Sequence, residues 1–120
     1  MTADFARRFA EEWIAAWNAH DLPRILSHYA DDFQMSSPYI AEWLAEPTGT
    51  LDGKAAIGAY WTRGLAKLPN LHFTLEHTLA GPRSLTLVYT NAATGRRAAE
   101  VLFFNDALTE VTRAVAHYEI

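Results

Sequence analysis

Apolar residues near the start of the chain recur at the spacing of one helix face. Aromatic side chains occupy every fourth position, at Phe5, Phe9, Trp13 and Trp17. Four residues are close to one helical turn, so these rings share a face, whereas Arg7 and Glu11 lie off it. Thr2 and Asp4 are both suitable N-caps. The pattern predicts an amphipathic first helix whose aromatic stripe faces the core.

Two more helices are predicted before residue 70. Asp21 is the expected N-cap of a short second helix, with Pro23 in its first turn. The apolar stripe of this helix is Leu22, Ile25, Leu26 and Tyr29. Asp52 is the expected N-cap of the third helix. The stripe of the third helix is Ile57, Tyr60, Trp61 and Leu65.

The segment between the second and third helices is less regular. Phe33, Met35 and Ser37 alternate with polar residues, which predicts a short strand that Pro38 stops. Residues 39–51 fit either a lid or a small helix.

After residue 70 the apolar period changes to two, which is the spacing of half-buried strands. Leu71, Phe73, Leu75 and Leu79 fall on one parity, and residues 98–104 are apolar on both faces except at Glu100. Turns at residues 81–82, 94–96 and 105–106 separate four strands, the last over residues 111–119. Helices followed by antiparallel strands must pack as two layers, so an α+β fold with a concave sheet face is expected.

Size and charge limit the function classes. A chain of 120 residues fits one domain, expected at residues 1–120. The net charge is −4 and no basic stripe is present, so no nucleic-acid partner is expected. No apolar run approaches the ~20 residues of a membrane helix, so no membrane partner is expected. The lack of cysteine and of a signal-peptide pattern favours a cytoplasmic location.

Several stretches resemble the nuclear transport factor 2-like superfamily, and within it the SnoaL-like proteins related to polyketide cyclases and ketosteroid isomerase. The stretches are residues 17–22, 29–33, 51–57, 99–105 and 113–118. The resemblance implies a cone-shaped, cystatin-like roll with three N-terminal helices packed on a curved, mainly antiparallel sheet. It implies little about function, because this scaffold hosts several enzyme classes and non-catalytic binders.

The functional residues of these relatives carry over unevenly. Trp13 stands where ketosteroid isomerase-like members have a tyrosine that donates to the substrate, and Ser37 stands where they have the aspartate base. Glu100 matches their second acid. Isomerisation of the ketosteroid type is therefore not expected. The aspartate–arginine–aspartate set of the limonene epoxide hydrolase-like members is also unmatched. Ala98 stands in the place of the arginine, and His117 lies near the place of the second aspartate.

Glu100 and His117 are the candidate catalytic residues. Glu100 lies among apolar residues, where desolvation raises the pKa of a carboxyl group toward the range of a general acid or base. If His117 on the last strand shares its face, the two form a carboxylate–imidazole pair able to move a proton. A structural role for Glu100, paired with Arg113 or His117, is the alternative.

Aromatic and polar residues supply a candidate ligand site. Trp13, Tyr60 and Tyr89 are predicted to wall the pocket, with Trp43 as a lid. The remaining candidates for ligand binding are Trp17, Ser37, Asn91 and Leu102. No metal-ligand cluster and no phosphate-binding glycine loop is recognisable, so no cofactor is expected.

Three hypotheses remain open from sequence. The first is a cofactor-free isomerase, cyclase or hydrolase that acts on a small hydrophobic carbonyl or cyclic compound through Glu100, with Trp13 or Tyr60 donating to a substrate oxygen. The second is a non-catalytic binding protein for such a molecule. The third is a dimerisation module with a filled core. A homodimer is expected in addition, because Val101 and Phe103 would face outward beside Thr86 and Val88.

Overall fold

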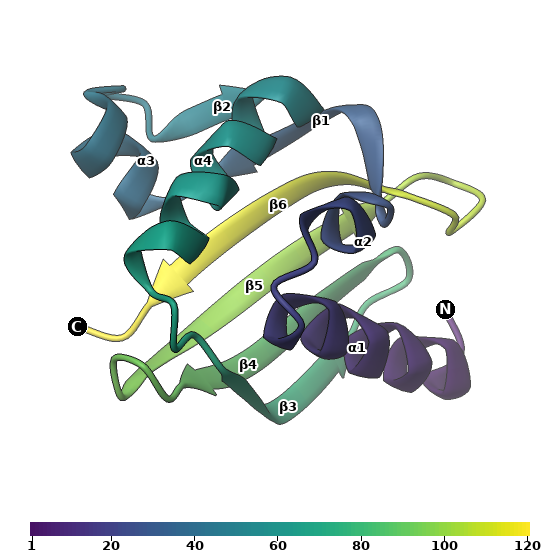
Figure 1. Ribbon diagram of the computed structural model, residues 1–120. Coiled ribbons are helices and arrows are strands. Elements are labelled where there is room, and N and C mark those ends of the chain that lie inside the picture. Colours follow the sequence, from purple (N-terminus) through teal and green to yellow (C-terminus); the bar gives the residue numbers. More distant parts are fainter.

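The computed structural model describes residues 1–120 as four helices and six strands (Figure 1). Along the chain these are α1 (Ala3–Asn18), α2 (Leu22–Leu26), β1 (Tyr29–Ser36), α3 (Pro38–Leu44), β2 (Thr50–Asp52), α4 (Lys54–Lys67), β3 (Phe73–Ala80), β4 (Ser84–Asn91), β5 (Arg96–Phe104) and β6 (Val111–Tyr118). None of the helices has both the length and the apolar character that crossing a membrane requires.

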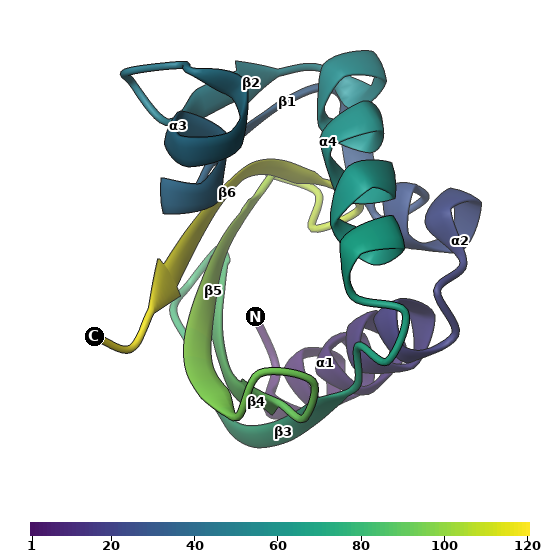
Figure 2. The same ribbon diagram turned by 60° about the vertical axis from the view of Figure 1, so that its left-hand side comes forward.

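The strands form one sheet in the order β2-β1-β6-β5-β4-β3, which curves around a concave face without closing (Figure 2). Neighbouring strands are antiparallel except β1 and β6, which run parallel. On the concave side, α1 packs against β3 and α4 packs against β1. The α+β class and the curved, mainly antiparallel sheet are therefore confirmed.

Residues 38–52 contain more regular structure than predicted. Pro38 fits the first turn of α3, and the Ser37 hydroxyl caps this helix by accepting a hydrogen bond from the Tyr39 N–H at 3.2 Å. Ala45 then adopts a left-handed conformation that ends α3, and the short β2 follows. Of the two alternatives for residues 39–51, a lid or a small helix, the small helix is confirmed, which gives four helices where three were expected to pack on the sheet.

Two of the three predicted caps are present. The hydroxyl of Thr2, not the carboxylate of Asp4, caps α1 by accepting from the Phe5 N–H at 3.1 Å. Asp21 caps α2 as predicted, since its carboxylate accepts from the Arg24 N–H at 3.2 Å. Both caps satisfy N–H groups that a helix leaves without a partner in its first turn.

The second helix is shorter than predicted and the third begins differently. Since α2 ends at Leu26, Tyr29 belongs to β1. The predicted Asp52 cap is wrong, because Asp52 is the last residue of β2, where it lies opposite Gln34 of β1 and accepts a hydrogen bond from the Gln34 side chain. Gly53 precedes α4 instead with a φ of +86°, a conformation that glycine tolerates best.

A β-bulge in β3 changes which side chains of this strand face inward. The register with β4 shifts between Leu75 and His77, so that Leu79 lies opposite Thr86. One extra residue reverses the alternation beyond the bulge. Leu79 is therefore 58% exposed and does not share the inward face with Phe73 as predicted.

The central strand β5 places alternate residues in the core. Ala98, Glu100, Leu102 and Phe104 are buried, and the residues between them are partly exposed. Opposite them lies the aromatic stripe of α1, where Trp13 packs against Phe73 with ring centroids 5.9 Å apart.

Two polar clamps hold α1 in place. The side-chain amide of Asn18 donates to the Phe73 carbonyl at 2.9 Å, and its oxygen accepts from the Phe73 N–H at 2.7 Å, which ties the end of α1 to β3. Glu12 accepts hydrogen bonds from Arg24 and pairs with His28, which ties α1 to α2. The hydrogen bond from Arg24 lowers the pKa of Glu12.

We expect Asn18→Ala to lower the free energy of unfolding by about 1–3 kcal/mol, because two partly buried backbone groups of Phe73 lose their partners. Urea denaturation followed by tryptophan fluorescence measures the change. The exposed Asn70 offers a matched control, since Asn70→Ala should stay within about 0.5 kcal/mol of wild type. Equal stability of the Asn18→Ala protein and wild type would contradict a stabilising role for the bridge.

Candidate functional site

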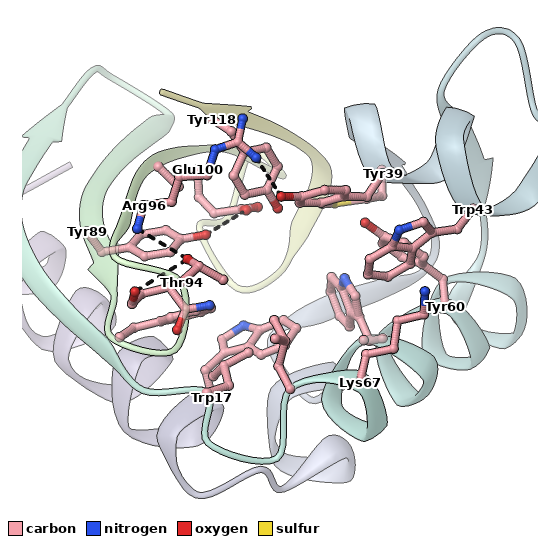
Figure 3. A pocket seen from close by; sticks show the side chains of 18 of the residues that line it. Trp17, Tyr39, Trp43, Tyr60, Lys67, Tyr89, Thr94, Arg96, Glu100 and Tyr118 are labelled. Carbon is pink, nitrogen blue, oxygen red and sulfur yellow. Dashed lines mark hydrogen bonds between the residues drawn. The ribbon is translucent and has the colours of Figure 1, made fainter. Parts of the chain in front are cut away.

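A cavity of about 250 Å³ lies between the concave sheet face and helices α1, α3 and α4 (Figure 3). Most of its lining is apolar or aromatic. The lining residues are Trp13, Trp17, Met35, Tyr39, Trp43, Tyr60, Trp61, Gly64, Lys67, Leu68, Leu71, Phe73, Tyr89, Asn91, Thr94, Arg96, Ala98, Glu100 and Tyr118. The volume is close to the lower limit of about 300 Å³ for ligand pockets, so a fitting ligand is small.

Glu100 is the one acidic residue of the cavity lining. It lies in the middle of β5 and is only 5% exposed. Its carboxylate accepts one hydrogen bond, from the Tyr89 hydroxyl, at 3.3 Å, which is long for an O–H···O bond. Burial disfavours the charged form and raises the pKa of Glu100 to about 7, although the bond from Tyr89 partly opposes this. The carboxyl group therefore exchanges its proton near neutral pH.

Tyrosine hydroxyls surround this carboxyl group. Burial raises the pKa of Tyr60 to about 12, and it also raises the pKa values of Tyr89 and Tyr118 well above the usual value of a phenol. The negative charge of Glu100 contributes to all three shifts. These phenols consequently keep their protons at neutral pH and serve as hydrogen-bond donors.

The two donors predicted to contact a substrate oxygen are already engaged within the protein. The Trp13 indole donates to the Tyr29 hydroxyl at 2.9 Å, and the Tyr60 hydroxyl donates to Ser37 at 3.2 Å. The Trp17 indole nitrogen is buried and has no hydrogen-bond partner in the protein, and the Trp17 ring meets the Trp61 ring edge to face. Trp13 and Tyr60 therefore contribute ring surface to the wall, and Trp17 lines the cavity beside them.

The predicted ligand-binding residues divide into two groups. Six of them line the cavity, namely Trp13, Trp17, Trp43, Tyr60, Tyr89 and Asn91. Two do not: Ser37 caps α3 and accepts from Tyr60, and Leu102 is fully buried core. The Asn91 oxygen accepts from the Ala93 N–H, so this side chain holds the turn after β4.

The expected pairing of His117 with Glu100 is not formed. Ala116, not His117, lies opposite Glu100 in the sheet, and His117 lies opposite Ala99. Successive residues of a strand point to opposite faces, so the His117 side chain is exposed on the convex face. Arg113 is also exposed there, which removes the predicted structural pairing of Glu100 as well.

The cavity mouth includes residues that the sequence reasoning missed. Lys67 at the end of α4 and Thr94 after β4 are exposed, while Arg96 and Tyr118 are half-buried. Arg96 shares the parity of Glu100 on β5, a signal that separates it from the outward-facing Arg97. Tyr118 lies opposite Ala98, which only the register of β6 reveals.

Comparison with known proteins supports the fold. A SnoaL-like protein of unknown function from Burkholderia thailandensis E264 is 50% identical over 99% of this chain and 98% of that chain, with a TM-score of 0.94. A putative SnoaL-like polyketide cyclase from Shewanella denitrificans OS-217 is 15% identical over 96% and 90% of the two chains, with a TM-score of 0.73.

A third similar structure is AclR, a putative hydroxylase from Streptomyces galilaeus. It is 20% identical over 98% of this chain and 77% of that chain, with a TM-score of 0.72. No curated protein matches the sequence. Residues 10–120 match the sequence profile of the SnoaL-like domain, which covers almost the entire chain. The resemblance to the SnoaL-like proteins is thereby confirmed, structures named NTF2-like share the fold at 15% identity, and this protein belongs to the SnoaL-like family.

Proposed function

We propose that the cavity binds a small hydrophobic carbonyl or cyclic compound and that Glu100 transfers protons to and from it as a general acid and base. The observation that carries this proposal is a single buried carboxyl group with a pKa of about 7 at the centre of an apolar cavity. Such a group is half-ionised at neutral pH, so it both removes and returns protons. The reaction class is that of an isomerase or cyclase without a cofactor, or of a hydrolase.

The elementary step is proton removal from a carbon next to a carbonyl group. The C–H proton moves to the Glu100 carboxylate, and the electron pair of the broken bond shifts to the carbonyl oxygen as an enolate. Tyr118 lines the cavity, and the charge of Glu100 contributes to its raised pKa. Its protonated hydroxyl is our candidate donor to this oxygen. Return of the proton to the same or another carbon completes an exchange or an isomerisation.

The comparisons support this class of chemistry only at the level of the fold. The structures named as a putative polyketide cyclase and a putative hydroxylase share the fold at 15% and 20% identity. Because one scaffold hosts many activities, the proposal depends on Glu100 and its surroundings.

A binding protein without catalysis is the second candidate. The observation in its favour is that Glu100 has neither a second carboxyl group nor a histidine beside it in the cavity lining, since His117 lies on the other face of the sheet. Hydrolysis, which needs a positioned water, is the reaction class that this arrangement supports least.

We also propose that a second copy of the chain covers the convex sheet face. Val88, Val101 and Phe103 are partly exposed on this side, and the Arg113 guanidinium lies 5.2 Å from the centre of the Phe103 ring. Leu79 adds exposed apolar surface through the bulge in β3. A contiguous apolar patch on a sheet face favours a protein interface.

The first test concerns the protonation of Glu100. The pKa of Glu100 is about 7 in the folded state against 4.5 ordinarily. The stability that the protein has with a protonated Glu100 is therefore complete below pH 4.5 and is lost as the pH rises through 7. Glutamine cannot ionise. As the pH rises from 4.5 to 8, the unfolding free energy of Glu100→Gln should therefore increase by about 3 kcal/mol relative to that of wild type.

Chemical denaturation at a series of pH values measures this difference. Glu110→Gln, which alters an exposed glutamate, should track wild type over the whole range. Parallel stability curves for Glu100→Gln and wild type would contradict a raised pKa at Glu100.

The second test measures proton transfer on a ketone. Wild type should accelerate exchange of the α-protons of 2-tetralone in D₂O, followed by ¹H NMR, because Glu100 removes them. Glu100→Gln should lower the rate by about 10²–10⁴-fold while the ketone still binds, since only the base is lost. Tyr118→Phe should slow exchange without removing the base, and Glu110→Gln should match wild type. Binding of the ketone without accelerated exchange by wild type would favour the binding protein.

The third test concerns the convex face. Light scattering at tens of micromolar should give the mass of a dimer, and Val101→Glu should give a monomer because it buries a charge in an apolar interface. Ala107→Glu, in an exposed turn, should remain dimeric. A monomer mass for wild type would refute the proposed dimer.

A further inference from the structure

We propose that the ligand carries a negatively charged group, such as a carboxylate, that binds at the cavity mouth between Lys67 and Arg96 while its apolar part fills the interior. This inference rests on the proposed function and adds the chemical class and the orientation of the ligand. It follows from how the basic residues of the chain are distributed and held.

Most basic residues of the protein are neutralised by a nearby carboxylate. Six of the ten form ion pairs, namely Arg7, Arg8, Arg24, Lys54, Arg83 and Arg97. Of the other four, Arg113 lies over the Phe103 ring on the convex face. The remaining three, Arg63, Lys67 and Arg96, lie at or beside the cavity mouth. In a chain with a net charge of −4, three of the four basic side chains without an ion pair thus lie together at or beside the cavity mouth.

Lys67 is held in position by an aromatic ring. Its Nζ lies 4.5 Å from the centre of the Trp43 ring, a cation–π contact between α4 and α3 (Figure 3). Arg63, one turn earlier on α4, lies 5.8 Å from the same ring and donates to the Trp43 carbonyl at 3.2 Å. Neither contact neutralises a charge, so both cations retain attraction for an anion.

Arg96 is held on the opposite side of the mouth, at the start of β5. Its Nη1 donates to the Tyr39 hydroxyl at 2.6 Å (Figure 3). Its Nε donates to the Glu119 backbone carbonyl at 3.0 Å. The guanidinium carbon also lies 5.4 Å from the centre of the Tyr118 ring. All these partners are neutral, and Nη2 forms no hydrogen bond to the protein. The guanidinium is therefore fixed in place with donors left for a ligand.

The interior of the cavity determines which way such a ligand faces. Its lining is mainly aromatic, and its one acidic residue is the buried Glu100. A negative group would lose solvation there and would be repelled by the carboxylate of Glu100. At the mouth the same group stays in contact with water and is attracted by Lys67 and Arg96. The apolar part of the ligand is therefore directed inward, and its reacting carbon lies on the Glu100 side.

A matched pair of probes tests this inference. Naphthalene-2-acetate and naphthalene-2-acetamide differ in charge but hardly in shape, and isothermal titration calorimetry at pH 6 keeps Glu100 mainly neutral. At low salt the acetate should bind about ten-fold more tightly than the amide, as two exposed ion pairs allow. The preference should shrink in 0.5 M NaCl because the charges are screened.

Substitutions at Lys67 and Arg96 test whether the preference for the acetate over the amide arises at the cavity mouth. Lys67→Gln and Arg96→Gln should each reduce the ratio of acetate affinity to amide affinity by about 2–5-fold. Arg96→Lys should retain most of the preference. The matched controls are Lys54→Gln at the other end of α4 and Arg97→Gln on the outward face of β5, which change the net charge equally and should keep the full preference.

Each outcome decides a different claim. Equal binding of the two probes, or a preference that survives both Lys67→Gln and Arg96→Gln, would overturn the anionic ligand while the apolar site stands. Failure of both probes to bind would count against the cavity as an apolar binding site and would overturn the proposed function together with this inference.

Discussion

The cost of burying a carboxyl group among aromatic rings governs the chemistry of this protein. Glu100 lies in the middle of the sheet, where one long hydrogen bond from Tyr89 replaces the several water molecules that an exposed carboxylate would bind. This incomplete compensation keeps the proton bound until the pH reaches about 7. A shorter hydrogen bond, a second donor or admitted water would lower that pKa, so the raised pKa depends on the apolar walls around the carboxyl group.

Those walls depend in turn on how the helices are held against the curved sheet. Asn18 ties the end of α1 to the edge strand β3, and Glu12 ties the middle of α1 to Arg24 on α2. These polar contacts place α1 over β3, and α4 lies near β1 at the other side of the sheet. A space of about 250 Å³ remains between them.

Membership of the SnoaL-like family explains this architecture but leaves the activity to the side chains in the cavity. The site separates two functions in space. An apolar interior with one carboxyl group suits proton transfer, and a rim with Lys67 and Arg96 suits recognition of charge. The relative from Burkholderia thailandensis shares 50% of its residues with this chain, so experiments on either protein bear on the other.

Periodic patterns in the sequence determined what depends on neighbours along the chain. The four-residue spacing of aromatic residues located α1, and the change of apolar period after residue 70, together with the turn signals, located β4, β5 and β6. The apolar residues on both sides of Glu100 made it a candidate, but the structure decided that it faces inward with Leu102. Tertiary structure decided what depends on the pairing of distant segments. The register of β6 against β5 placed His117 outside and Tyr118 inside, and a bulge turned Leu79 outward. The packing of helices on the sheet engaged Trp13 and Tyr60 in internal hydrogen bonds and brought Lys67 and Arg96 to one mouth. A shift of one residue in strand pairing moves a side chain across the sheet, and a single sequence carries no local signal of that shift.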